Sequence, residues 1–122
     1  MNRPRVLFID DDATHMHPLL KAGWEVCFAP SLPAVQAYIE ASRHGFDVVC
    51  LDCHMHPWSG LDIAKEVLIH RGFPIVLHSQ DWEARREVAR LLSEHERPHT
   101  LITYRPNSEF ADRIKIWLEE LP

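Results

Sequence analysis

The sequence has few cysteines, no excess of positive charge and no long apolar run, and each shortage excludes a class of proteins. Its three cysteines, Cys27, Cys50 and Cys53, are too few and odd in number for a disulfide framework. The formal net charge of -5 argues against a general affinity for nucleic acid or for an anionic membrane surface. No apolar run reaches the roughly 18 residues that a membrane-spanning helix needs. We therefore expect neither nucleic acid nor a membrane among its partners.

The N-terminal residues do not have the pattern of an export signal. Two arginines are followed by only four apolar residues before Asp10, which is typical of a β-strand and not of a signal peptide. With no export signal, we expect the cysteines to be reduced and the protein to be cytoplasmic. At 122 residues, of which 46% are hydrophobic, the chain is long and apolar enough for one domain, residues 1–122, with a buried core.

Short apolar runs alternate with amphipathic stretches, which is typical of a parallel sheet covered by helices on both faces. The expected strands are residues 5–9, 25–28, 47–51, 74–77 and 100–104. The expected helices are a short one from about residue 17, then 31–43, one from residue 59 or 60, 81–94 and 108–120. Pro18 fits only the first turn of a helix, so residues 11–17 are expected to be a loop. This order predicts a three-layer α/β sandwich around a five-stranded parallel sheet.

Polar side chains follow four of these strands at the points where the strands end. In an open parallel sheet, ligands bind outside the carboxyl ends of the strands, so we expect these side chains to gather at one edge. They are Asp10, Asp11, Asp12, His15 and His17 after the first strand, Asp52, Cys53, His54 and His56 after the third, His78, Ser79 and Asp81 after the fourth, and Tyr104 and Arg105 after the fifth.

The chain has nine histidines, and four of them form two His-x-His pairs, His15/His17 and His54/His56. Alternate residues of an extended segment share a face, so each pair could chelate Zn²⁺, Mn²⁺ or Fe²⁺; the alternative is a pair of polar loop residues. His78 is either a core histidine or a general acid, and Ser79 either caps the following helix or contacts a phosphate.

These residues resemble the motifs of a response-regulator receiver domain. The similarity covers nearly the whole chain, and its motif residues are Asp10-Asp11, Asp52, Met55 and Gly60 three and eight residues later, Ser79, and Arg105-Pro106. In that family the fold is flavodoxin-like, the acids hold Mg²⁺, and a hydroxyl and a lysine contact the phosphoryl oxygens. Adjacent carboxylates repel one another unless a hard cation neutralises them, which agrees with that assignment.

The resemblance implies a flavodoxin-like (βα)5 fold and a role in phosphorelay signalling. Asp52 would be the phospho-acceptor, Asp10, Asp11 and Asp52 would hold a divalent metal, most simply Mg²⁺, and Ser79 and Arg105 would contact the phosphate. The partner would be a histidine kinase or another signalling protein. Three positions depart from the family pattern: Arg105 replaces its lysine, His78 precedes the hydroxyl, and Ile102 stands at the aromatic switch position.

Two alternatives stay open, and with them the question whether the chain is an enzyme. The segment His78-Ser79-x-Asp81 is similar to a receiver-like group predicted to process cyclic or other phosphoesters. That resemblance implies a metal-dependent phosphoesterase that also uses His54 and His56, with Zn²⁺ or Mn²⁺ as the metal, although His54 stands where that group has an aspartate. The second alternative is a degenerate receiver that serves only as a protein-binding module.

Overall fold

The computed structural model describes residues 3–42 and 44–122. Within these ranges, five parallel strands form one sheet in the order β2-β1-β3-β4-β5. The strands are β1 (Arg5–Ile9), β2 (Glu25–Ala29), β3 (Val48–Leu51), β4 (Ile75–Leu77) and β5 (His99–Leu101). The helices are α1 (His17–Lys21), α2 (Leu32–Ala41), α3 (Gly60–Glu66), α4 (Trp82–Glu94) and α5 (Ser108–Glu120), with 3-10 turns η1 (Ala13–Met16) and η2 (Leu68–His70). The predicted flavodoxin-like α/β fold is therefore confirmed.

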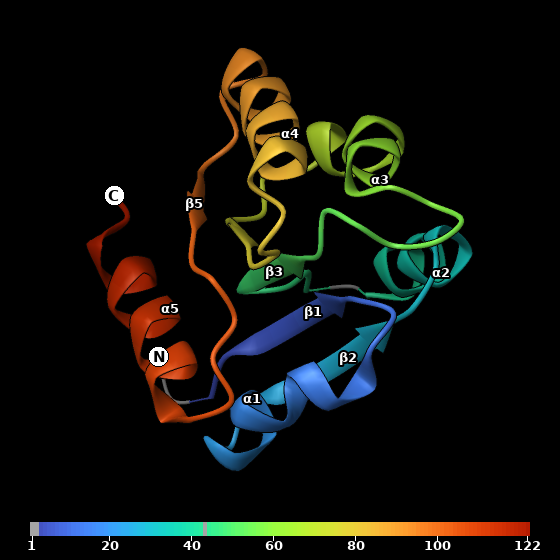
Figure 1. Cartoon of the computed structure of the whole chain (residues 1–122). Coiled ribbons are helices and arrows are strands. Elements are labelled where there is room, and N and C mark those ends of the chain that lie inside the picture. Colours follow the sequence, from blue (N-terminus) through green and yellow to red (C-terminus); the bar gives the residue numbers. More distant parts are fainter. Residues whose placement is uncertain (1–2, 43) are drawn as a thin grey trace.

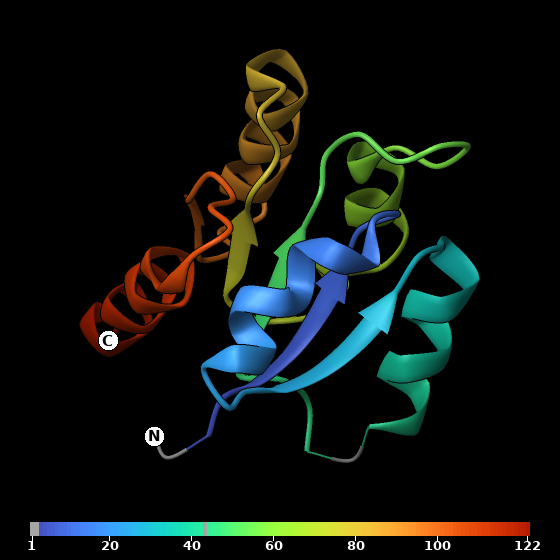
Figure 2. The same ribbon diagram turned by 60° about the horizontal axis from the view of Figure 1, so that its bottom comes forward.

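Helices cover both faces of the sheet, as Figure 1 shows. Successive strand residues point to opposite faces, so β1 contributes Val6 and Phe8 to one core and Leu7 and Ile9 to the other. The Val6 face packs against α1 and α5, and α1 passes in front of β1 in Figure 2. The other face packs against α2, α3 and α4. No helix in the described part of the chain is both long and apolar enough to span a membrane.

Side-chain caps fix the start of most of these elements. Asp12 caps η1 and Ser31 caps α2, each by accepting a backbone N–H two or three residues on. Pro18 lies in the first turn of α1, as predicted, but residues 13–16 form a 3-10 turn and not the expected loop. Of the two alternatives for Ser79, the role of helix cap is wrong, because Asp81 caps α4. The predicted end of the second helix at residue 43 lies outside the described residues.

The parallel register aligns the ends of the strands. Ile9 pairs with Leu51 and Leu51 with Leu77, so the residues that follow them, Asp10, Asp52 and His78, emerge side by side. Strand β5 ends at Leu101, three residues before the predicted end, although Tyr104 still donates its N–H to the carbonyl of His78. One sheet edge therefore carries most of the polar residues that the sequence points to.

Gly60 allows the loop after β3 to fold back onto the start of α3. A Cβ at this position would lie 2.6 Å from the Cα of Cys53 and 2.9 Å from the carbonyl oxygen of Asp52. Both contacts are with backbone, which has little freedom to move away, and the Gly60 N–H also donates to the Cys53 carbonyl at 3.1 Å. The backbone around Asp52 thus depends on the absence of a side chain at residue 60.

We predict that Gly60→Ala lowers the free energy of unfolding by about 1 to 3 kcal/mol, the usual cost of overpacking. Urea denaturation measures it as a shift of the midpoint at constant slope. Gly72→Ala is the matched control, because a Cβ there meets no heavy atom of the described residues within 4 Å. A Gly60 variant as stable as the Gly72 variant would contradict the proposed steric constraint.

Candidate functional site

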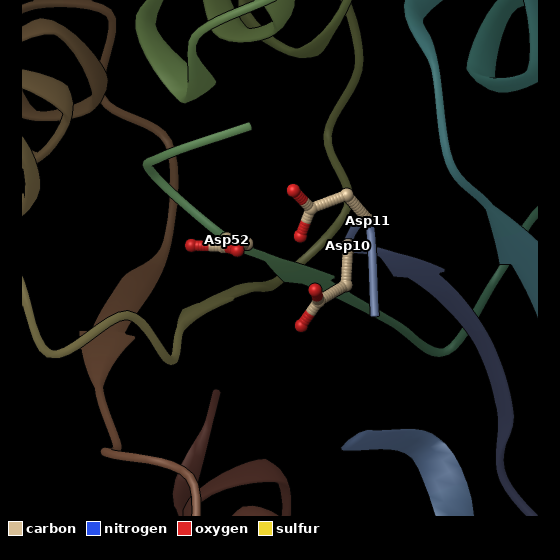
Figure 3. A group of neighbouring side chains, drawn as sticks. All are labelled: Asp10, Asp11 and Asp52. Carbon is tan, nitrogen blue, oxygen red and sulfur yellow. The ribbon is translucent and has the colours of Figure 1, made fainter. Parts of the chain in front are cut away.

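Three carboxylates gather at the carboxyl ends of β1 and β3. Each of Asp10, Asp11 and Asp52 offers one oxygen within 4.8 Å of the others, and Figure 3 shows their positions after the two strands. Asp10 is fully buried, Asp52 is half-buried and Asp11 is exposed. The strand register places Asp10 beside Asp52, and the chain direction places Asp11 above them. The acids named from the sequence therefore form one cluster.

The Asp10 carboxylate accepts three hydrogen bonds. Oδ1 accepts the backbone N–H of Asp12 at 2.8 Å, and Oδ2 accepts from His15 Nδ1 at 2.8 Å and from His78 Nε2 at 2.9 Å. Burial alone would raise the pKa of Asp10, but the bonds from His78, Asp12 and His15 lower it to about 2. Because an ionised carboxylate only accepts, both imidazole nitrogens that face it carry protons.

His78 is held in place by aromatic packing. Its ring is 2% exposed, stacks on Phe8 with centroids 4.8 Å apart, and meets the edge of Phe110 at 6.1 Å. Among the described residues, its Nδ1 has no hydrogen-bond partner. His78 is therefore buried, as the alternative of a core histidine held, but its ring bonds to the Asp10 carboxylate of the cluster.

The environment of Asp52 is less favourable to a negative charge than the environment of Asp10 is. Burial raises the pKa of Asp52 above its ordinary value, and the nearby charges of Asp10 and Asp11 act in the same direction. The N–H of His54 donates to Asp52 Oδ1 at 3.1 Å and opposes that rise. Asp10 and Asp52 thus sit side by side with pKa values pushed apart, which is typical of functional carboxylate clusters.

The donor set fits a hard divalent cation such as Mg²⁺. Three carboxylates of decreasing burial face one another, and their mutual repulsion favours a cation that neutralises it. Asp52 has one oxygen, Oδ2, with no hydrogen bond to the described residues, and the exposed Asp11 leaves room for water ligands. Asp10, Asp11 and Asp52 are the residues that would hold such a cation.

An open cavity of about 440 Å³ lies above the cluster. This size suits a small phosphorylated group and its waters. The cavity is lined by Asp10, His15, Asp52, His54, His78, Ser79, Gln80, Asp81 and Tyr104. Its polar lining joins the ends of β1, β3, β4 and β5 into one site.

The two His-x-His pairs take different positions. His15 and His17 lie in η1 and at the start of α1, so the premise of an extended segment was wrong, and only His15 turns toward Asp10. His54 and His56 do share an exposed face, because both are exposed whereas Met55 between them and Cys53 before them are buried. His54 lines the cavity with its Nδ1 3.5 Å from Asp81 Oδ2, whereas His56 does not line it.

Of the two residues predicted to contact a phosphate, Ser79 lines the cavity and Arg105 does not. Ser79 is 8% exposed and lines the cavity, where its Oγ accepts the N–H of Asp81 at 3.2 Å. Arg105 follows Tyr104 but is exposed and does not line the cavity. Cys53 is buried, burial raises the pKa of its thiol to about 12, and it does not belong to the acid cluster.

Two residues have larger roles in the site than the sequence indicated. His15 bonds Asp10, and its ring packs on Tyr104 with centroids 4.4 Å apart. Tyr104 in turn contacts Phe110 of α5. The Asp12-x-Thr14 pattern, typical of a capped helical start, was the available signal that His15 folds back toward Asp10.

Comparison with known proteins supports the fold. A response regulator receiver domain protein (CheY-like) from Methanospirillum hungatei JF-1 is 20% identical, with a TM-score of 0.74, and the match covers 97% of this chain and 95% of that one. The chemotaxis response regulator CheY4 of Vibrio cholerae is 20% identical over 95% of this chain and 98% of that one, with a TM-score of 0.72. The HemR receiver domain from Leptospira biflexa is 19% identical over 98% of both chains, with a TM-score of 0.74.

No protein-family model matches the sequence, and no curated protein matches it. At identities near 20% the structural matches show the fold alone. The chain thus has the flavodoxin-like fold of CheY-like receiver domains, and its activity rests on the residues of its own site.

We predict that Asp52→Asn raises the free energy of unfolding at pH 7 in the absence of divalent cations. The folded pKa of Asp52 lies above its unfolded value of about 3.8, so its negative charge destabilises the fold above both values. The gain should therefore shrink as the pH falls through the folded pKa and vanish below the unfolded one. Urea denaturation at several pH values measures it, with Asp112→Asn on the exposed face of α5 as the control. An Asp52 variant less stable than the wild type at pH 7 would contradict the assigned environment.

Proposed function

We propose that this chain, which has the fold of CheY-like receiver domains, acts in phosphorelay signalling as an atypical receiver whose phospho-acceptor is Asp52. A divalent cation, Mg²⁺ in the first instance, is held by Asp10, Asp11 and Asp52. The phosphoryl donor is a histidine kinase or another phosphorylated signalling protein, and the setting is the cytoplasm. The observation that carries the proposal is the group of three carboxylates within 4.8 Å of one another at the ends of β1 and β3.

The position of Asp52 suits a nucleophile. It is the half-buried member of the cluster and opens into the cavity, whereas Asp10 is fully buried and committed to three hydrogen bonds. The bond from the His54 N–H orients Oδ1. An incoming phosphoryl group therefore meets Asp52 first, while Asp10 supplies fixed negative charge below it.

The reaction is an in-line displacement at phosphorus. A carboxylate oxygen of Asp52 forms the new P–O bond as the P–N bond of a phosphohistidine breaks, and the imidazole of the donor leaves with the electron pair and takes up a proton. A divalent cation, when bound, would offset the charge of the phosphoryl oxygens. Ser79 would donate its hydroxyl proton to one phosphoryl oxygen, and the exposed Arg105, which follows Tyr104 in the chain, would reach another through its long side chain.

We predict that acetyl phosphate with Mg²⁺ adds one phosphoryl group to the wild-type protein and none to Asp52→Asn. Asn has no nucleophilic carboxylate, so the new P–O bond does not form. Ser79→Ala should slow the reaction about tenfold, the value of one hydrogen bond made to the transferring group. Intact-protein mass spectrometry over time measures both effects.

Asp112→Asn, on the surface of α5, serves as the control and should be phosphorylated at the wild-type rate. Removal of Mg²⁺ with a chelator should stop the reaction in all variants. Phosphorylation that persists in Asp52→Asn would sink the proposal.

A second function, metal-dependent phosphoester hydrolysis, is favoured by one observation. Imidazoles from two strand ends, His54 and His78, line the same cavity as Asp52, and His78 Nε2 lies 2.9 Å from Asp10. Imidazole suits proton transfer to a leaving group near neutral pH. The exposed His54, 3.5 Å from Asp81, is the group better placed to reach a leaving oxygen.

The two functions differ in turnover. Hydrolysis predicts repeated turnover of p-nitrophenyl phosphate or bis(p-nitrophenyl) phosphate with Mn²⁺ or Mg²⁺, and a loss of about 100-fold or more in His54→Gln. His70→Gln, in η2 and outside the cavity, is the matched control. Release of p-nitrophenol followed by absorbance measures it. One phosphoryl group per chain without turnover would favour the receiver function, and neither reaction in any variant would leave the protein-binding alternative.

A further inference from the structure

The outer face of α4 carries a stripe of one tryptophan and four charged side chains, which we call the α4 stripe. These side chains line one shallow hollow of about 260 Å³ and therefore share a face of the helix; they are Trp82, Glu83, Arg86, Glu87 and Arg90. All five are exposed, and Figure 1 shows α4 on the outside of the molecule, beside α3 and β5. The opposite side of the helix, with Val88 and Leu92, packs into the core. The α4 stripe is thus a free surface of the described chain.

The order of the four charges does not stabilise the helix itself. Residues four positions apart are neighbours on a helix surface, and like charges at that spacing destabilise it. Glu83 and Glu87 are both acidic, and Arg86 and Arg90 are both basic. In the part of the chain that the structure describes, none of these four side chains forms an ion pair. The charges of the α4 stripe are therefore available to a partner.

The same order of charges is complementary to itself. A two-fold axis that crosses the helix between residues 86 and 87 lays a second α4 antiparallel to the first. Glu83 of each copy then faces Arg90 of the other, and Arg86 of each copy faces Glu87 of the other. A parallel arrangement would instead set Glu83 opposite Glu83 and Arg90 opposite Arg90. The charges thus favour the antiparallel orientation and oppose the parallel one.

Trp82 supplies the apolar area that the charged side chains lack. Its side chain is 58% exposed, and an exposed tryptophan is the residue type that contributes most often to the energy of protein interfaces. In the antiparallel pair it lies near Arg90 of the other copy, whose guanidinium can stack on the indole ring. Since exposed ion pairs add little affinity, Trp82 provides the attraction and the four charges fix the register.

We propose that the α4 stripe is a self-association surface, through which two copies of this chain form an antiparallel dimer. The occupant is a second copy because the charges of the α4 stripe match their own order reversed. The inference goes beyond the phosphorelay role and does not depend on it, since no residue of the α4 stripe lines the cavity above the acid cluster. A contact between two single helices is small, so the dimer is a weak one.

The test is sedimentation equilibrium of the full chain at concentrations up to about 1 mM, a range that detects weak interfaces. We expect the mass of the wild type to rise from the 14.2 kDa of one chain toward that of two as the concentration increases. Glu83→Arg sets like charges opposite each other twice and should weaken the association about tenfold or more. Trp82→Ala should weaken it by a similar factor, because the exposed indole is lost.

Two double variants that keep the net charge of the wild type test the register. Glu83→Arg with Arg90→Glu exchanges the charges of one contact, so opposite charges face each other again and the association should return to within about threefold of the wild type. Glu83→Arg with Arg86→Glu has the same composition but leaves like charges in both contacts, so it should stay about tenfold weaker or more. Circular dichroism verifies that each variant is folded.

Three outcomes would overturn the inference. A wild type that stays monomeric up to about 1 mM would leave the α4 stripe to a different protein. A dimer that Glu83→Arg and Trp82→Ala leave intact would place the contact on another surface. Equal association of the two double variants would reject the antiparallel register. Each outcome is independent of whether Asp52 accepts a phosphoryl group, so failure of this inference is distinguishable from failure of the proposed function.

Discussion

The buried carboxylate of Asp10 is the constraint on which the rest of the site depends. It follows directly on a strand with no exposed residue from Val6 to Ile9, so it has to find its hydrogen bonds inside the protein. It does so with one backbone N–H and two imidazoles, from η1 and from the end of β4. Those bonds tie the end of β1 to the turn η1 that follows it and to the end of β4, which is 68 residues further along the chain. A histidine before Ser79, where the receiver family has a small residue, is thereby explained: its Nε2–H stabilises the charge of Asp10.

This arrangement separates the tasks of the acids. Asp10 is stabilised as an anion, which keeps a negative charge at the base of the site, while Asp52 beside it is left with burial and repulsion that raise its pKa. A divalent cation relieves that repulsion, so its binding is favoured by the same forces that destabilise the three carboxylates on their own. Retention of all three acids therefore argues for chemistry at this site, since a surface that only binds a protein gains nothing from the repulsion.

Much of the fold and of the acid site was predictable because strands of a parallel sheet end in register. The apolar runs located β1, β3 and β4, and the residues after them had to meet once Ile9, Leu51 and Leu77 were paired. Local capping was harder to predict, because Ser79 and Asp81 are equally good caps in the sequence and only the loop geometry selects Asp81. The short turn η1 hid the role of His15, since a loop and a 3-10 turn send residues 15 and 17 in different directions. Nothing in the sequence indicated that Tyr104 would line the cavity while Arg105 would be exposed and outside its lining.

The receiver and hydrolase hypotheses share more chemistry than their names suggest. Both need a carboxylate that meets phosphorus, a cation that offsets charge, and an open cavity, and the structure supplies the same residues for each. They differ in what happens after the first displacement, because an aspartyl phosphate becomes a signal if water is kept away and a hydrolytic intermediate if water is activated. Here the choice depends on the imidazoles around Asp52. His78 and His15 both bond to Asp10, and in the cavity lining His54 is the imidazole with an exposed ring. With two imidazoles bonded to one carboxylate and one at the solvent, the histidines of this cavity serve chiefly to hold charge in place, which favours a long-lived phosphoryl group over rapid hydrolysis.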